Sequence, residues 1–532
     1  MNKGQFQEVF GPARKDEPIR EGQPQAAGAA DLGRRALGGA FWLAGERGYR
    51  QVLYLVRAIV LARLLTPLDF GLVAIGDLSI HFLGIFSNFG FESALMQRPN
   101  PTPEALHTTY WAKVGRTGLT AGVLWWGAPV VAAWFHAPQA VWVLRAMAFI
   151  ALLQGLDSLS FILWRKDLQF RQFFRYEALG LTLDLLVTVT AAAIWHNVWA
   201  LVLGSLAGTL FRFAYSFFRH PYRPKLVFAM GEARELFSFG KWLLLSSIML
   251  FLITKGTDTL SGFFFGAAAL GLYQMASRFA LIPANHLADT LFGVMFPAYS
   301  LIQEDRLRLA AVFLKVLQVT AFVIFPMAAL LAVTVGPALP LFLGSQWQGL
   351  VTLVPWLALG GGVQALLRTG SPVFLASGRP NYQFAIDLVA ALGILLAVWP
   401  LSQHFGLAGL ALAYGAGISL GLPLWALFIC RQLHVKGREL AISLVPALLG
   451  SLLLSAVVLV PGWIWHLRLT GFHNLGLLVI LSILGAASYV IFISLAECYF
   501  PSGYQPIKST WNLVQAVRQR SREHGLPEPE WG

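Results

Sequence analysis

Long apolar runs separated by short polar breaks cover the chain from about residue 38 to residue 498. About 20 mostly apolar residues in one helix are enough to cross a bilayer, so each run predicts one transmembrane helix. We count about 14 runs and expect an all-α, polytopic integral membrane protein. Their approximate limits are 38–62, 70–95, 108–134, 139–163, 174–194, 198–218, 238–260, 267–296, 310–334, 349–377, 381–401, 406–430, 441–461 and 474–498.

Basic residues sort the breaks between these runs into two alternating sets. One set is rich in Arg and Lys, as at 165–171 and 431–438, and the other set, as at 404–406, holds almost none. Arg63 and Arg468 are the main exceptions. Since short loops rich in Lys and Arg stay in the cytoplasm, we expect both termini to be cytoplasmic.

The chain contains a weak internal repeat. LLTPLDFGLV at 64–73 aligns with FFGAAALGLY at 264–273, which matches Gly71 with Gly271. Because six spans separate the copies, the repeat predicts two six-helix lobes related by a pseudo-two-fold axis along the membrane normal, followed by two further helices. The predicted parts are a disordered cytoplasmic tail (1–36), an N-lobe (37–218), a cytoplasmic linker (219–237), a C-lobe (238–430), two extra spans (441–498) and a cytoplasmic tail (499–532).

Composition agrees with a membrane protein. The chain is 57% hydrophobic and 12% charged, whereas about a quarter of the residues of a soluble domain are charged. The net charge of +13 comes mainly from the loops, so it indicates topology and no nucleic acid partner is expected. Cys430 and Cys498 define no disulfide framework, and the scattered histidines predict no metal site and no cofactor.

The first span carries charges that an ordinary transmembrane helix avoids. Glu46, Arg50 and Arg57 share one helical face, and Arg47 lies one step round. A charge at bilayer depth costs several kcal/mol unless it faces protein or water, so the stripe predicts a water-filled cavity that receives an anion. Snorkelling of the arginines to the headgroups is the alternative. The candidate substrate-binding cations are Arg47, Arg50, Arg116 and Arg368.

Polar stripes also run along spans 2 and 8, at the same spacing in each. Such stripes predict a cavity lining, although helix-to-helix hydrogen bonds would produce the same pattern. Two related lobes are typical of transporters, and an ion gradient, of H⁺ or Na⁺, would reset such a carrier, with Asp77, His81 or Asp289 as coupling sites. The cavity and coupling candidates are Glu46, Asp77, His81, Asn88, Glu92, Asn285 and Asp289.

A third group of charges lies near the predicted outer surface. Arg57 and Asp77 fall at similar depth, about 27–30 Å from the cytoplasmic ends at 1.5 Å per residue, and Lys255, Asp258 and Arg278 match them in the second lobe. We expect these five residues to form charge pairs of an outer gate, with Arg57 paired to Asp77. If each side chain only snorkels to the interface, changing it would be nearly neutral.

Several segments together resemble a known family. The runs ARLLTPLDFGLVAIGD (62–77), FGFESALMQR (89–98) and LWRKDLQFRQFFRYE (163–177) are similar to the polysaccharide exporters of the multidrug/oligosaccharidyl-lipid/polysaccharide superfamily, nearest to the Wzx-type subgroup. This resemblance implies a flippase with two lobes in a V shape and an undecaprenyl-pyrophosphate-linked oligosaccharide as cargo. It also implies a role in O-antigen, capsule or exopolysaccharide synthesis. The partners that it implies are membrane lipid and a polymerase or chain-length protein of the same pathway.

Two other functions stay open at this point. A cation-coupled drug antiporter of the same superfamily would use a carboxylate-rich, aromatic pocket, for which Asp77, Glu92, Asp184 and Asp289 are available. A polymerase or ligase of the same pathway would need acceptor-binding structure outside the membrane, and the outer loops are short. The arginines of the first span favour the flippase, which is not an enzyme.

Overall fold

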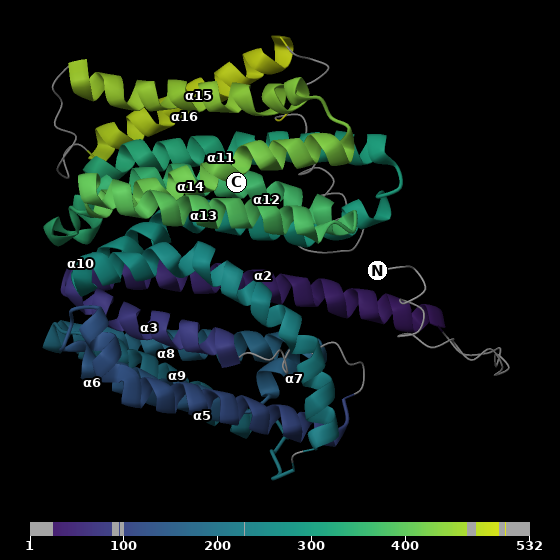
Figure 1. The fold of residues 1–532 in the computed structure, drawn as a ribbon, viewed down its shortest axis with the longest axis vertical. Helices are drawn as coiled ribbons and strands as arrows, with labels where there is room; N and C mark the ends of the chain where they lie inside the picture. The colour runs from purple at the N-terminus through teal and green to yellow at the C-terminus, as the bar shows by residue number, and fades with distance from the viewer. Residues whose placement is uncertain are drawn as a thin grey trace.

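The computed structural model describes residues 25–87, 95, 101–227, 229–464, 475–499 and 506, and within them the chain is helical apart from short turns (Figure 1). The helices are α2 (Gln25–Leu64), α3 (Pro67–Ser87), α5 (Pro103–Trp134), α6 (Ala140–Leu156), α7 (Ser160–Lys166), α8 (Phe170–Trp195), α9 (Trp199–Arg219), α10 (Met230–Leu301), α11 (Arg306–Leu343), the 3₁₀ turn η1 (Ser345–Trp347), α12 (Leu350–Ala376), α13 (Pro380–Phe405), α14 (Leu407–Leu433), α15 (Gly437–Ile464) and α16 (Leu475–Tyr499).

These helices account for the predicted spans. Ten helices of the described residues are long and apolar enough to cross a membrane, and α6 with α7, bent by 47°, makes an eleventh. The 72-residue α10 turns at Gly266, whose φ of 80° belongs to the left-handed region, so it supplies two spans. With α2 and α5, which are 40 and 32 residues long, the predicted 14 spans are present. The all-α membrane fold is confirmed.

The helices form two lobes (Figure 1). Helices α3 and α5–α9 lie in one half of the molecule and α11–α14 in the other, with α2 and α10 between them. Helices α15 and α16 lie at the far edge, where α15 packs on α11 and α16 packs on α15. The two extra spans therefore stand outside the pair of lobes, as the resemblance implies.

Two predicted boundaries differ from the structure. Helix α2 begins at Gln25, so the prediction of a disordered tail is wrong for 25–36, where Ala, Leu and Arg are strong helix formers. Helix α10 begins at Met230, inside the predicted linker, because GEAREL again favours a helix. The C-terminal tail predicted at 499–532 lies almost wholly outside the described residues.

The linker that remains is fixed to the N-lobe. The Lys225 amide donates to His107 Nδ1 of α5 at 3.2 Å, and Trp111 Nε1 donates to the Lys225 carbonyl at 2.8 Å. The rings of His107 and Tyr222 stack at 5.6 Å. The Ala229 amide donates to Thr108 Oγ1 at 3.0 Å. The chain therefore enters α10 from a defined position on α5, which fixes where the second lobe begins.

We call the two ends of the molecule by the charge of their loops. The basic end holds the loops at 165–171, 220–227 and 302–308, and the neutral end holds the loops at 135–139 and 344–348.

At the neutral end each lobe buries residues of the other lobe in its own core. Ala58 and Ala62 of α2 are buried in the C-lobe core, whereas Ala267 and Leu270 of α10 are buried in the N-lobe core.

This exchange centres on a close crossing of α3 with the second half of α10. A Cβ added to Gly71 would lie 1.7 Å from the Ala267 carbonyl oxygen, and one added to Gly271 would lie 2.0 Å from the Pro67 carbonyl oxygen. The internal repeat pairs 67 with 267 and 71 with 271, so the two contacts are equivalents under the predicted pseudo-two-fold axis. The axis passes through this crossing, and only glycine allows the two backbones to approach so closely.

Candidate functional site

Charged side chains from both lobes face a common space between α2, α3 and α10. The charges that act most strongly on the Asp77 carboxylate are, in decreasing order, those of His81, Arg278, Lys255 and Arg57. Asp77, His81 and Arg278 keep exposed surface although Asp77 and Arg278 lie deep in the protein. Side chains that are exposed and yet surrounded by charges from both lobes mark the space between α2, α3 and α10 as the candidate site.

An arginine from each lobe contributes its charge to this space, Arg57 from α2 and Arg278 from α10. Arg278 is close enough to feel the charges of both Arg57 and Asp77. Like charges held together in a cavity with low-dielectric walls focus a positive potential, which a bound anion would relieve.

Arg57 is held by the N-lobe and not by Asp77. Its Nη1 donates to Asp184 Oδ2 of α8 at 2.5 Å, and both side chains are largely buried, 19% and 8% exposed. Thr188 Oγ1 donates to the other carboxylate oxygen at 3.0 Å. Close approach of α9 at Gly204 closes the site behind them. The predicted Arg57–Asp77 ion pair is therefore wrong for this conformation, because depth along a helix does not fix which neighbour a side chain faces.

The basic half of α2 carries the ion pair that its sequence predicts. Arg50 Nη2 lies 2.8 Å from Glu46 Oε1, with Glu46 buried and Arg50 41% exposed. Arg47 is exposed beside them. Arg50 and Glu46 also act electrostatically on Glu177 of α8. This mixed-charge cluster lies on the side of α2 toward the basic end, at a mouth of the cavity.

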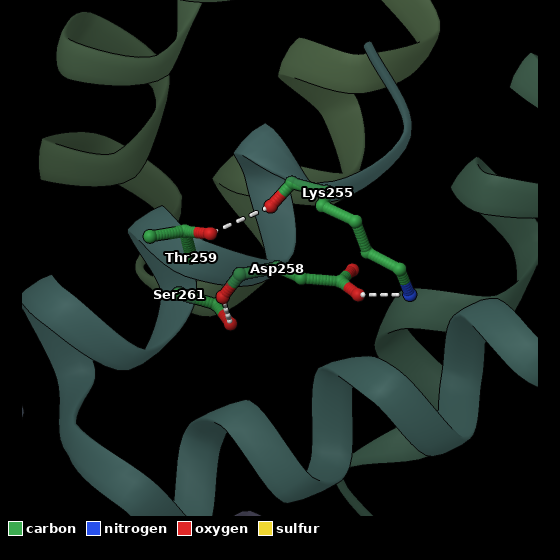
Figure 2. A network of polar contacts seen from close by, with 4 residues as sticks. All are labelled: Lys255, Asp258, Thr259 and Ser261. Atoms are coloured by element: carbon green, nitrogen blue, oxygen red, sulfur yellow. Dashed lines mark hydrogen bonds and ion pairs between the residues drawn. The ribbon is translucent and has the colours of Figure 1, made fainter. Parts of the chain in front are cut away.

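The C-lobe contributes a second ion pair. Lys255 Nζ lies 3.2 Å from Asp258 Oδ2, three residues further along the first half of α10, and Asp258 is buried. Figure 2 shows this pair with two hydroxyls of the same helix that bond its backbone: Thr259 Oγ1 donates to the Lys255 carbonyl and Ser261 Oγ to the Asp258 carbonyl. Such bonds bend helices, and here they precede the turn at Gly266.

The other sequence-predicted residues fall in different places. Arg368 of α12 is half-buried and acts on Tyr414 and Asp387. Arg116 of α5 is half-buried in the N-lobe, and Asn285 lines a C-lobe cavity. The side chain of Asp289, and Asn88 and Glu92 entirely, lie outside the described residues.

That C-lobe cavity has a volume of about 390 Å³ and opens between the two halves of α10, α12 and α14. Lys255, Asp258 and Arg278 line it. Gln364 and Tyr414 also line it, and sequence reasoning, which followed charged residues and the stripes on spans 2 and 8, did not select them. Gln364 stands four residues before Arg368 on the same helical face, which is a signal that could have indicated it. Only the tertiary packing brings these two side chains to the charged cluster.

Hydrogen bonds join the lobes at the neutral end. Gln346 Nε2 donates to the Ala62 carbonyl at 2.6 Å and to the Leu65 carbonyl at 3.0 Å, and Trp347 Nε1 donates to Ala62 at 2.8 Å. These carbonyls belong to the end of α2, where a helix leaves acceptors unpaired. Arg63 Nε also donates to the Phe342 carbonyl at 2.8 Å. The turn η1 of the C-lobe therefore caps the first helix of the N-lobe.

Comparison with known proteins identifies the family. The family model described as "Polysaccharide biosynthesis protein" matches residues 60–352, more than half of the chain. The chain belongs to this family. Its relatives in the family include the succinoglycan biosynthesis transport protein ExoT of Rhizobium meliloti, 27% identical over 68% of this chain and 71% of the relative. The lipopolysaccharide biosynthesis protein WzxC of Escherichia coli K12 is 26% identical over 72% and 78%.

Solved structures agree with this polysaccharide biosynthesis fold. The lipid II flippase MurJ, in an inward closed conformation, superposes with a TM-score of 0.67 at 14% identity and covers 87% of this chain and 99% of its own. An inward-facing multidrug resistance MATE family transporter of the MOP superfamily superposes with a TM-score of 0.53 at 14% identity over 72% and 94%. At these identities the likeness shows the fold alone.

Proposed function

We propose that this protein is a flippase that moves undecaprenyl-pyrophosphate-linked oligosaccharide repeat units across the bacterial inner membrane by alternating access, for O-antigen, exopolysaccharide or capsule synthesis. The observation that carries the proposal is the gathering of cations from both lobes between α2, α3 and α10: Arg57 comes from α2, and Lys255 and Arg278, which line a cavity, come from α10. A pyrophosphate bound between these cations is attracted to both lobes. Guanidinium groups bind phosphate oxygens in pairs and stay charged at all relevant pH values.

The transport cycle follows from this arrangement. The lipid tail stays in the bilayer, the pyrophosphate binds the arginines, and the sugars fill the aqueous space. The charged pyrophosphate therefore never enters the hydrocarbon core without partners for its charge. Arg47 and Arg50 at the basic mouth of α2 make the first contacts, and Arg116 and Arg368 are further contacts within each lobe. The neutral-end contacts at Gly71 and Gln346 close the outer mouth while the inner mouth is open. We place the reset of the carrier at Asp77, His81 or Asp289, with H⁺ or Na⁺ as coupling ion.

Relatives and charges favour this function over drug efflux. ExoT and WzxC are named for succinoglycan and lipopolysaccharide biosynthesis, and the MATE neighbour supports only the fold. Among the carboxylates that a cationic drug would need, Asp184 is paired with Arg57 and Asp258 with Lys255. A pocket whose carboxylates already hold the chain's own cations is poorly suited to an added one. We expect no enzymatic activity, and a polymerase and a chain-length protein of the same pathway as partners.

We expect Arg278→Ala to lower surface polysaccharide at least about tenfold without loss of the protein from the membrane, because one half of the anion site is removed. Arg278→Lys should restore part of the export, since the charge survives but the planar fork does not. Arg306→Ala, on the exposed loop at the basic end, is the control. Surface polysaccharide and membrane-bound protein are measured in the same cells. Full export by Arg278→Ala would contradict the anion site.

Topology supplies an independent test. We propose that the basic end and both termini are cytoplasmic, because short basic loops are retained there. Alkaline phosphatase, which is active only outside the cytoplasm, should be silent when fused after Gly532 and active when fused after Asn197. A strong signal from the first fusion, at normal expression, would reverse the orientation.

A further inference from the structure

The C-lobe cavity is built differently from the charged space that it adjoins. Most of its polar lining is neutral, from hydroxyl and amide side chains such as Thr257, Tyr273, Gln274, Gln364 and Tyr414. Its volume of about 390 Å³ lies in the range of roughly 300–1,000 Å³ typical of small-molecule sites. Its neutral lining therefore suits a compact, hydroxyl-bearing ligand, while Lys255, Asp258 and Arg278 add charged groups to the same pocket.

Hydrogen-bonding groups in the pocket are left for a ligand. Tyr273 is buried, 1% exposed, and its hydroxyl lies near Thr257 without making a hydrogen bond of good geometry. The Tyr414 hydroxyl donates to Gln364 Oε1 at 3.0 Å, which leaves the Gln364 amide to donate into the pocket. A buried polar group without a partner costs free energy, which ligand hydroxyls would recover.

The pocket shares its mouth with the anion site. Lys255 and Arg278 line the pocket, and both also act on Asp77 across the space between the lobes. A phosphate held by Arg278 therefore places the group bonded to it at the pocket entrance. The Asp258 carboxylate, already paired with the Lys255 ammonium, faces the same pocket as a further acceptor for hydroxyls and is a poor site for an added cation.

We infer that the C-lobe pocket binds the sugar directly joined to the pyrophosphate and so determines which lipid-linked oligosaccharide is accepted. This inference rests on the proposed flippase function and adds the part of the substrate that is selected. The pyrophosphate supplies affinity through the arginines and is the same in every such lipid. Neutral hydrogen bonds from Gln364, Tyr414 and Tyr273 distinguish one sugar from another, because a missing hydroxyl leaves a buried partner unsatisfied.

The test measures binding of defined lipids to the purified full-length protein in nanodiscs. The probes are polyprenyl pyrophosphate without a sugar, and the same lipid carrying one glucose, galactose or N-acetylhexosamine residue. The wild type should bind at least one sugar-bearing lipid about tenfold or more tighter than the bare lipid, which corresponds to one or two added hydrogen bonds. Gln364→Ala and Tyr414→Phe should bring this ratio close to one and leave the affinity for the bare lipid unchanged.

Two controls separate the possible failures. Ser419→Ala lies on the same helix α14 as Tyr414, outside the pocket lining, and should keep the wild-type ratio. Melting temperatures of all variants exclude misfolding as the cause. If the wild type does not bind the bare lipid at all, the flippase proposal fails. If it binds bare and sugar-bearing lipids equally, or if both pocket variants keep the wild-type ratio, the sugar pocket is wrong. If the protein binds sodium in a way that depends on Gln364, and shows no preference among the sugars, the proposed sugar pocket is also wrong.

Discussion

Replacing Gly71 with alanine is expected to abolish polysaccharide export while the protein still inserts in the membrane. The new Cβ would lie 1.7 Å from the backbone oxygen of Ala267, and backbone cannot rotate away as a side chain can. The two lobes must then separate at the neutral end. Since we propose that this contact closes the outer mouth, Gly71→Ala should hold the carrier open to the outside, and Gly271→Ala, its equivalent, should do the same.

The matched control for this pair is Gly84→Ala on the same helix α3, where an added Cβ meets no atom within 4 Å. Alanine favours a helix over glycine by roughly 1 kcal/mol, so a loss at Gly71 or Gly271 cannot come from weaker helix formation. Export is measured with His81 intact. In separate His81→Cys variants that lack Cys430 and Cys498, labelling by a membrane-impermeant maleimide is measured. Faster labelling from outside in the glycine variants supports the proposal that the contact at Gly71 closes the outer mouth. Unchanged export and labelling in both variants would contradict it.

Sequence reasoning could predict that Gly71 and Gly271 are equivalent, because the weak match of 64–73 with 264–273 aligns them. It could not predict that they cross, since a two-fold axis brings equivalent positions together only where they lie close to it. The Glu46–Arg50 pair was also predictable, since residues four apart on one helix always lie side by side. Local geometry and symmetry were therefore sufficient for these features.

Contacts between helices that are not neighbours in sequence were harder to predict. Depth placed Arg57 beside Asp77, but the rotation of α2 turns Arg57 toward Asp184 of α8. Likewise the sequence does not show that Gln364 of α12, although it shares a helical face with Arg368, lies beside Tyr414 of α14. Which helices pack together, and at what rotation, is decided by side-chain packing over the whole bundle. The sequence pattern thus predicted the spans, whereas the partner of Arg57 and the C-lobe cavity required the fold.

The Arg57–Asp184 pair allows stability and transport to be separated. Asp184→Ala leaves the largely buried Arg57 without its carboxylate. Removing one partner of a fully buried pair costs about 3–5 kcal/mol, and we expect the lower part of this range because Arg57 reaches the cavity. Asp184→Ala should therefore lower both the melting temperature in detergent and the export of polysaccharide.

Exchanging the charges of Arg57 and Asp184 should restore the melting temperature but not the export of polysaccharide. In the double variant Arg57→Asp with Asp184→Arg the pair can form again, so the melting temperature should rise above that of either single variant. Export should stay low, because the guanidinium now stands on α8, where it no longer faces Arg278 across the cavity. Recovery of export together with stability would show that Arg57 serves only the fold. The corresponding exchange of Arg57 with Asp77 should restore neither the melting temperature nor export, since the Arg57 guanidinium is bonded to Asp184 in this conformation.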